Sequence, residues 1–497
     1  MYALRTIGSA CADVERTVDE ILAVLPFPGP PEPAEVTALL HGADLRLEPV
    51  DLPEGQRVTI AYLETLVDAD RLWREVLQPL LSGTAPPDRL PRTRQLQSGS
   101  IVLHRLLAGW AVIFRGDGLP LGLMISGVKR RPVREPTTER SLIGPKEGLV
   151  EDLALNIGLV RTRLRDPLLR VEQFTVGRRS RTGIALLYVE DVAAPAIVRL
   201  IRRRLKRVAV DTIRTTADVV EITIARGLTV FPLVEETERP DKVETALAVG
   251  RICVLLDGSP FAILLPVTFF EFQKDSESAV QGPLVAGFIV QIRFLGILTA
   301  TILPSLYVAL LTVNVTVLPL PMAITLSTTR VAIPYPVLTE TLIMMVIADV
   351  LTEATSQAAS AVGNTLAIVG TLIIGQMVVQ ARLASNLMVI VLAGSVMGSF
   401  LTLKYQLSYA FRIIKYPLIV LSGLLGLEGL IGGLILLLVH LVSLKSAGVP
   451  YLSPLAPADW RSLRQYSVVQ PPRGDMRRRP GTWRARQRVR GRRRGRR

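Results

Sequence analysis

The spacing of apolar residues changes near residue 287 of this chain. Before that point, short runs with strand-like alternation, such as Leu45–Glu48 and Arg57–Leu63, are interspersed with amphipathic helical stretches, such as Asp68–Leu81. After that point, the apolar runs become long and nearly free of charge. The pattern predicts an α/β part followed by an all-α membrane part.

Two α/β subdomains are predicted in the first part, over residues 1–130 (with a linker) and 131–280. The first combines helices at 13–25 and 68–81 with strands at 45–48, 57–63, 101–107 and 110–114. The second combines helices at 146–165, 194–208 and 241–249 with strands at 184–189, 219–225, 252–256 and 261–266. Alternation of strand and helix predicts layered domains of the βαβ type.

The membrane part is predicted over residues 281–457 as a multi-span helical domain. A helix needs about 20 mainly apolar residues to cross a bilayer. A short run, Leu338–Glu353, carries three acids, and the proline-rich segment 318–336 cannot form one regular helix, so a broken or re-entrant element is expected there. The long apolar runs are Phe288–Val313, Val362–Ala381, Asn386–Leu403 and Tyr416–Leu444.

The number of crossings stays open between four and six. The N-terminus lacks a secretory signal and is expected in the cytoplasm, and the basic C-terminal tail should stay there by the positive-inside rule. An even number of crossings follows. Four crossings place Lys404, Arg412 and Lys415 outside, and five place the tail outside. A sixth crossing, or a re-entrant pair within 314–353, would reconcile the two.

The composition adds a distinct basic tail. Hydrophobic residues make up 49% of the 497 and charged residues 20%, which excludes a disordered or collagen-like chain. Most of the net charge of +15 comes from thirteen Arg against one acid over 473–497. Residues 458–497 are therefore expected to be a disordered cytoplasmic tail. Contact with anionic lipid is favoured over nucleic acid, because the arginine-rich stretch 473–497 has a single aromatic residue, Trp483, and the tail emerges next to the bilayer.

No cofactor, metal or catalytic site is predicted. The two cysteines and three histidines are scattered, without the spacing of metal ligands. The sequence lacks a phosphate-binding glycine loop, a zinc-protease helix motif and a nucleophile elbow. The chain is therefore not expected to be an enzyme.

Acidic residues in the short apolar run are the main functional candidates. Asp349 and Glu353 lie four residues apart and share a helix face, and Glu340 precedes them. Acidic rings formed by repeated copies of such a helix attract cations, so the three residues suggest a pore lining. The alternative is that they lie in headgroups or water, on a helix that never crosses.

A fourth acid, Glu428, lies within the last long apolar run. A charge at the bilayer centre costs about 2.5–3.5 kcal/mol on insertion scales. Glu428 is therefore expected to face protein or water, either in a pore or gate or as a protonated group in a packed interface. Residues expected to allow close helix packing are Gly370, Gly375, Gln376, Gly429 and Gly433.

Two basic features also have competing interpretations. Arg178, Arg179 and Arg181 form a dense loop that could dock on anionic lipid or on an acidic partner, or could simply be solvated. Arg293, near the start of the first long run, is expected to snorkel to the cytoplasmic interface, with pairing to an acid as the alternative.

Several motifs in order resemble the A subunits of the GerA spore-germination family. The soluble part contains SLIGPKEGLVEDLALNIGLVRTRLRDP (141–167), TERPDKV (237–243) and LLDGSPFAILLPVTFFEF (255–272). The membrane part continues with LPSLYVALLT (303–312), IVGTLIIGQMVVQA (368–381) and GVPYLSPLAP (448–457). The resemblance extends from about residue 8 to 457 and leaves out the arginine-rich tail.

The resemblance implies a subunit of a nutrient germinant receptor in the spore inner membrane. Its implied partners are a transporter-like B subunit, a lipoprotein C subunit and further copies of itself, in an oligomeric ion-conducting channel that triggers ion release. The alternative within the same family is a SpoVAF-like accessory scaffold that assists germination without conducting.

Overall fold

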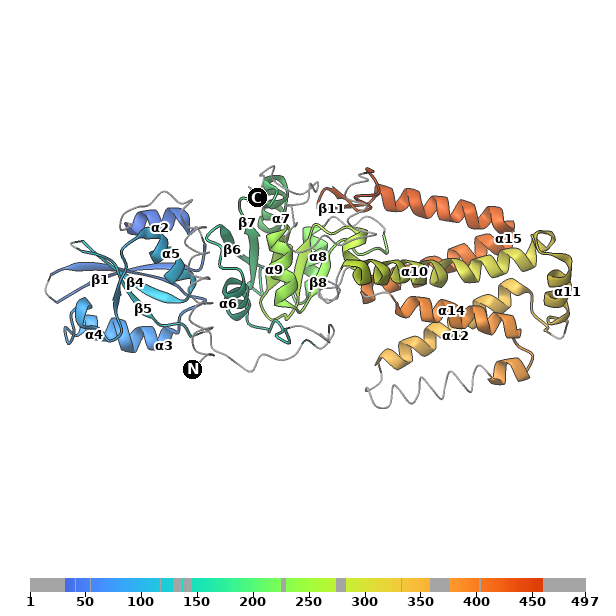
Figure 1. Ribbon diagram of the computed structural model, residues 1–497, viewed down its shortest axis with the longest axis horizontal. Helices are drawn as coiled ribbons and strands as arrows, with labels where there is room; N and C mark the ends of the chain where they lie inside the picture. The colour runs from blue at the N-terminus through green and yellow to red at the C-terminus, as the bar shows by residue number, and fades with distance from the viewer. Residues whose placement is uncertain are drawn as a thin grey trace, which may run out of the picture. The chain divides into compact units, whose positions relative to one another are not determined.

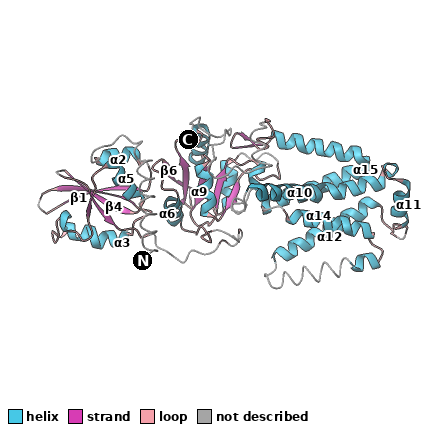
Figure 2. Ribbon diagram, viewed as in Figure 1, coloured by secondary structure: helices cyan, strands magenta, loops and turns pink. Residues whose placement is uncertain are grey.

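The computed structural model describes two units of different architecture. The described residues are 32–40, 42–53, 55–116, 118–127, 136, 139, 145–224, 229–273, 283–331, 333–357, 376–401 and 404–458. Within them, the α/β unit comprises 32–224 and 236–266, and the helical unit comprises 229–235 and 267–458. An α/β region followed by a helical region, as Figure 2 shows, confirms the expected fold class at that level. The predicted helix at 13–25 and the arginine-rich tail lie outside the described residues.

The first subdomain is a five-stranded sheet with helices on both faces. The strands β1 to β5 are Leu45–Asp51, Arg57–Leu63, Arg94–Gln95, Trp110–Arg115 and Leu121–Met124, and they lie in the order β1-β2-β4-β5-β3. Its helical elements are α2 (Pro33–Leu39), α3 (Ala69–Leu72), the π-helix η1 (Trp73–Leu77), α4 (Gln78–Leu81), η2 (Pro87–Arg89) and α5 (Gly99–Leu107). Alternate residues of β2 and β4 pack on α3–α4 and on α2 and α5.

The second subdomain repeats this arrangement. Its strands β6 to β10 are Leu169–Val176, Thr182–Val189, Glu235–Thr237, Ile252–Leu256 and Ala262–Leu265, in the order β6-β7-β9-β10-β8. Its helices are α6 (Leu153–Arg163), α7 (Pro195–Lys206), α8 (Thr216–Thr223) and α9 (Pro240–Ala248). Each subdomain thus has the same succession of helix, two strands, helical stretch, strand, helix and two strands (Figure 1).

Side-chain contacts confirm that the two subdomains are copies of one fold. On β1 and β2, Arg46 pairs with Glu64 and the Tyr62 hydroxyl donates to Glu48. The same contacts recur on β6 and β7. There, Arg170 pairs with Glu190 and Tyr188 donates to Glu172. The repeated sequences are LRLE and YLE in the first copy, and LRVE and YVE in the second.

Two predicted strands are helices in the structure. Residues 101–107 belong to α5, whose N-cap Ser98 accepts a hydrogen bond from the Ile101 amide. Residues 219–223 belong to α8, which begins with a capping box formed by Thr215 and Asp218. Both segments bury apolar residues at helical spacing. A short apolar run fits a strand or a helix equally well, and the N-terminal caps favour the helix here.

The expected βαβ topology is also wrong, because the registered strand pairs are antiparallel. Strands that follow each other directly in the chain, such as β1 and β2 or β9 and β10, pair as hairpins. The helix expected over 146–165 is shorter than predicted, because Asp152 caps α6 with hydrogen bonds from the amides of Ala154 and Leu155.

The helical unit contains four longer helices and several short elements among the described residues. The longer ones are α10 (Pro283–Thr312), α12 (Val337–Gln357), α14 (Asn386–Phe400) and α15 (Tyr405–Ser443). The short ones are η3 (Phe269–Gln273), η4 (Val315–Val317), α11 (Leu320–Thr328), β11 (Lys445–Ser446) and β12 (Val449–Pro450). The proline-rich segment 318–336 is indeed broken, since only α11 is helical within its described residues. The apolar run 362–381 lies largely outside the described residues.

The directions of these helices follow from contacts between residues of known position. Tyr307 of α10 contacts Ser385 at the start of α14, and the Ala300 carbonyl accepts from Ser395, so α10 and α14 are antiparallel. The Ser385 amide also donates to Glu340 near the start of α12. Helices α12 and α14 therefore begin at the same end and run in the same direction.

Helix α15 consists of two antiparallel arms. Gly426 adopts φ +63° and ψ −142°, a conformation readily available only to glycine. A Cβ on Gly433 would lie 2.5 Å from the Leu418 side chain, although these residues would be about 22 Å apart in a straight helix. The amide of Leu427, at the start of the second arm, donates to Asn314. The single span expected over 416–444 is therefore wrong, and residues 405–425 and 427–443 form a hairpin.

A short segment of chain packs at the open end of this hairpin. Residues 229–235, which we term the strap, follow α8 in sequence and end with the first residue of β8, yet they belong to the helical unit. Thr229 hydrogen-bonds to His440, and the ring of Phe231 packs edge-on against Phe411. Glu235 pairs with Lys404 at 3.4 Å. The strap thus contacts both the first and the last turns of α15.

Candidate functional site

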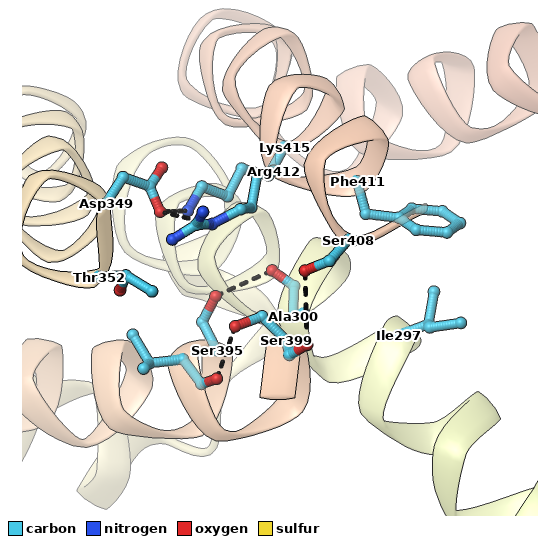
Figure 3. A pocket seen from close by; sticks show the side chains of 11 residues that line it. Ile297, Ala300, Asp349, Thr352, Ser395, Ser399, Ser408, Phe411, Arg412 and Lys415 are labelled. Atoms are coloured by element: carbon cyan, nitrogen blue, oxygen red, sulfur yellow. Dashed lines mark hydrogen bonds and ion pairs between the residues drawn. The ribbon is translucent and has the colours of Figure 1, made fainter. Parts of the chain in front are cut away.

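A polar pocket lies inside the helical unit, where four helices converge (Figure 3). The pocket is lined by residues that are mostly polar: Ile297, Ala300, Asp349, Thr352, Ser395, Val396, Ser399, Ser408, Phe411, Arg412 and Lys415. They come from α10, α12, α14 and the first arm of α15. So many polar groups inside an otherwise apolar bundle mark this pocket as the candidate site.

Asp349 is the centre of the charged cluster in this pocket. Its carboxylate accepts hydrogen bonds from the Lys415 ammonium at 2.9 Å and from the Tyr416 hydroxyl at 2.5 Å. The Arg412 guanidinium approaches the same carboxylate at 3.4 Å. Figure 3 shows both cations directed from α15 toward α12. Asp349 therefore fastens α12 to the first arm of α15.

Glu353 lies one turn further along α12 and extends this cluster. It accepts a hydrogen bond from the Tyr409 hydroxyl, which in turn contacts the hydroxyl of Tyr405. The Arg412 guanidinium lies 5.3 Å from the centre of the Tyr409 ring. Asp349, Glu353, Arg412 and Lys415 carry two charges of each sign, so the cluster is neutral as a whole.

The hydroxyl groups of the pocket donate to backbone carbonyls. Ser395 donates to Ala300 at 2.9 Å, and Ser399 and Ser408 donate to carbonyls of α14. Their oxygen lone pairs stay available as acceptors. The Nη2 atom of Arg412 is buried and has no hydrogen-bond partner among the described residues. The pocket thus offers acceptors and one donor, an arrangement suited to water or to a proton-carrying group.

Glu340 forms a second cluster at the other end of α12. Its fully buried carboxylate accepts from the Ser385 amide at 2.7 Å and pairs with Arg330. Arg330 also donates to the Tyr307 hydroxyl at 3.0 Å. The carboxylate therefore lies at the N-terminus of α14, where the helix dipole favours a negative charge. This second cluster joins α10, α12, α14 and the segment after α11.

The remaining predicted residues take different positions. Glu428 is exposed on the second arm of α15, whereas Gly429 and Gly433 are buried and pack against the first arm. Gln376 is exposed, and Gly370 and Gly375 lie outside the described residues. The guanidinium of Arg293 donates to the Gln273 carbonyl at 3.1 Å.

The basic loop of the second subdomain lies on the surface. Arg178, Arg179 and Arg181 are exposed between β6 and β7. The amides of Arg178 and Arg179 donate to the carbonyls of Val210 and Asp211, which holds the loop beside the chain that follows α7. No metal-binding group of three His, Cys, Asp or Glu side chains is found within the described ranges.

Sequence reasoning found the acids of α12 but not their partners. Arg330 stands in the proline-rich segment, and Arg412 and Lys415 stand at the start of an apolar run, where the sequence suggests interfacial positions. Their spacing carried a usable signal: Lys415 and Arg412 lie three residues apart and so share one helix face, as Asp349 and Glu353 do.

Comparison with known proteins identifies the family. A sequence model described as Bacillus/Clostridium GerA spore germination protein matches residues 37–482. The chain belongs to the GerA family. The match reaches into the basic tail, beyond the limit at residue 457 expected from the motifs.

Relatives within the GerA family match over most of their length. Uncharacterized membrane protein YfkQ of Bacillus subtilis is 30% identical over 462 residues, which cover 90% of this chain and 90% of that protein. Spore germination protein KA of Bacillus subtilis is 32% identical over 84% of this chain and 79% of its own. Spore germination protein B1 of Bacillus subtilis is 32% identical over 76% of this chain and 78% of its own.

Among solved structures, the N-terminal domain of the A subunit of the Bacillus megaterium spore germinant receptor GerK3 matches 48% of this chain and 93% of its own, at 22% identity and a TM-score of 0.36. Among the described residues of this GerA-family chain, two helices are long and apolar enough to cross a membrane, Gly287–Thr312 and Tyr405–Ser443. They fit a membrane protein, although the second is the bent helix α15.

Proposed function

We propose that this chain is the A subunit of a nutrient germinant receptor in the spore inner membrane, and that several copies form an ion-conducting channel that triggers ion release. Its partners would be a transporter-like B subunit and a lipoprotein C subunit. The match to the GerA family and to curated spore germination proteins supports the receptor role. The charged cluster around Asp349, inside an apolar bundle, is the observation that carries the ion-conducting role.

The helix directions support a membrane topology with six crossings. If α10 leaves the cytoplasm, α12 returns to it, and the apolar run 362–381, which the sequence predicts as a span, supplies the next outward crossing. Helix α14 and the two arms of α15 then add three crossings. Lys404, at the start of α15, and the C-terminal tail both come to lie in the cytoplasm, as the positive-inside rule requires. The α/β unit lies on the same side.

The cost of burying charge explains why the cluster points to conduction. Each charge near the bilayer centre costs about 2.5–3.5 kcal/mol on insertion scales, and such groups usually mark ion or proton pathways. In this structure, Lys415 and Arg412 pair with Asp349 and neutralise its charge. A shift of α12 away from α15 would release its acids toward an axis shared by neighbouring copies. Rings of such carboxylates would then select cations.

The test is ion flux through liposomes that contain the purified receptor complex. We expect Asp349→Asn to change cation flux or selectivity by at least tenfold, because it removes the central charge of the cluster. Glu428→Gln is the matched control, since Glu428 is exposed and does not line the pocket. Unchanged flux and selectivity in the variants of Glu340, Asp349 and Glu353 would remove the conducting role.

A second candidate is a SpoVAF-like accessory scaffold that assists germination without conducting. The observation in its favour is that each acid of α12 already has a partner within the chain: Arg330 for Glu340, Lys415 for Asp349 and Tyr409 for Glu353. A scaffold would oligomerise and promote germination, yet pass no ions in liposomes even with the B and C subunits present.

A further inference from the structure

The outer face of helix α7 in the second subdomain is unusually basic. Six of its cations follow one another without an acid between Arg199 and Arg207. Two of them turn to the protein: Arg202 binds Glu172, and Arg204 donates to the Thr223 carbonyl. The other four lie at i, i+4, i+7 and i+8, which places them on one face of the helix. These four are Arg199, Arg203, Lys206 and Arg207, and all are exposed.

The basic loop continues this face. Ser180 and its neighbours bind the chain that follows α7, where the Ile213 amide donates to the Ser180 hydroxyl. We term the resulting surface the basic face. It consists of eight exposed side chains: Arg178, Arg179, Arg181, Arg199, Arg203, Lys206, Arg207 and Arg214. None of the eight forms an ion pair with any residue that the structure describes.

Few acids lie around the basic face, and most of them already have partners. Glu172 and Glu190 pair with Arg202 and Arg170. Asp218 accepts from the backbone amides of Arg214 and Thr215. Asp211 is exposed beside the loop, so the surface carries eight cations against one acid. Like charges at i and i+4 destabilise a helix by about 0.2–0.5 kcal/mol per pair. Cations in the last turn of α7 are favoured by the helix dipole, but this accounts neither for Arg199 nor for the loop.

The first subdomain supplies an internal comparison. At the position of α7 it has residues 69–81, which carry two cations and two acids, and Arg71 pairs with Glu75 at 2.8 Å. The loop equivalent to 177–181 is 52–56, which contains no cation. The same fold is therefore stable without a basic surface here, so the cations answer a requirement other than folding.

From these observations we infer that the basic face binds the headgroups of anionic phospholipids. The second subdomain is the part of the α/β unit that continues directly into the helical unit, with only residues 266–282 between β10 and α10. Seventeen residues reach about 60 Å at most, so the subdomain stays near the bilayer that holds the helical unit. The inference depends on the proposed function in one respect only, namely that the helical unit lies in a membrane. Seven of the eight side chains are arginines, and each guanidinium group can donate two parallel hydrogen bonds to the oxygens of one phosphate group.

The test uses the full chain in bilayers of phosphatidylcholine alone or mixed with phosphatidylglycerol. We expect amide exchange in segments 177–181 and 199–214 to be at least tenfold slower with the anionic lipid, because each cation near such a surface strengthens binding about fivefold. The protection should disappear at about 1 M salt, where the screening length falls to about 3 Å.

A triple variant and a matched control make the test specific. Arg199→Gln, Arg203→Gln and Arg207→Gln together should abolish the lipid-dependent protection. Arg89→Gln, Arg92→Gln and Arg94→Gln, three exposed positions of the first subdomain, should leave it intact.

Equal exchange in the two bilayers at low salt would overturn the inference, and so would protection by polyglutamate without protection by anionic lipid, which would indicate an acidic protein partner. A chain that fails to float with any bilayer would overturn the proposed function as well. A chain that floats but shows no lipid-dependent protection overturns this inference alone.

Discussion

The two α/β subdomains are built on one plan but present different surfaces. Both place a Tyr–Glu hydrogen bond and an Arg–Glu ion pair at corresponding positions of their first two strands. Only the second adds an arginine, Arg202, to the Tyr–Glu pair, and only the second carries the basic face. Shared contacts therefore mark what the fold needs, and unshared ones mark what each copy has acquired.

The ion pair that joins the two copies should produce the largest effect. Arg161 of α6 binds Asp44 before β1 at 2.5 Å, and both side chains are almost completely buried. Arg161→Leu would leave the carboxylate of Asp44 buried without a counter-charge, held only by the Thr65 hydroxyl, so we expect the α/β unit to lose about 3–5 kcal/mol of unfolding free energy. Urea unfolding of the full chain, followed by amide exchange of the buried strands β4 and β9, measures the loss.

The double variant Asp44→Leu with Arg161→Leu is the control, because it removes both charges and should recover much of that stability. A single variant as stable as the double one would show that the pair does not hold the copies together.

A glycine repeated in both copies gives the next effect. Gly109 and Gly250 precede β4 and β9 with φ of +80° and +89°. A Cβ on Gly250 would lie 2.7 Å from the Val192 carbonyl, and one on Gly109 would lie 3.0 Å from the equivalent carbonyl of Leu66. We expect Ala at either position to destabilise its own subdomain by about 1–3 kcal/mol, and more at Gly250.

Amide exchange of β4 reports on the first subdomain and that of β9 on the second, so the loss of stability in each subdomain can be measured separately. Gly258→Ala is the control, since φ there is also +80° but a Cβ would meet nothing within 4 Å. If it were as damaging as Gly250→Ala, the close approach to the carbonyl would be irrelevant.

The smallest effect should come from the shared carboxylates. Burial opposes the ionisation of Glu172, but hydrogen bonds from Arg202 and Tyr188 outweigh it and lower the pKa of Glu172. Glu172→Gln should therefore cost about 1 kcal/mol at neutral pH. A lowered folded pKa means that this stabilisation is present above the unfolded value of about 4.3 and is lost as the pH falls below it.

Unfolding free energies at pH 7 and at about pH 3 test this, because the difference between wild type and Glu172→Gln should shrink at the lower pH. Glu48→Gln in the first copy, where no arginine joins the pair, should have a smaller effect at neutral pH. Equal effects at neutral pH in the two copies would assign no role to Arg202.

The sequence predicted the parts of the fold in which one period dominates. Strands such as 57–63 and helices such as 195–206 have unambiguous alternation or helical spacing. The prediction of a strand over 101–107 was wrong because the apolar residues of this segment fit the period of a strand as well as that of a helix. The N-cap at Ser98 favours the helix. The internal repeat is hard to detect in the sequence because few identities survive, although LRLE and LRVE stand at equivalent positions.

Only the acidic residues of the candidate site could be predicted from the sequence; their basic partners could not. An acid in an apolar run is visible in the sequence, and Glu340, Asp349 and Glu353 do lie among helices. Their partners depend on how those helices run, which the sequence does not show. The hairpin in α15 depends on one residue, Gly426, among several nearby glycines that remain helical.

The strap changes how the α/β unit is attached to the helices. A domain joined to its neighbour by a single linker can rotate freely about the single bonds of that linker. Here the second subdomain is connected to the helical unit through the strap and again after β10, and the strap contacts α15 at Lys404, Phe411 and His440. The chain therefore joins the two units at two places, and at the first of them the strap is held against the hairpin of α15.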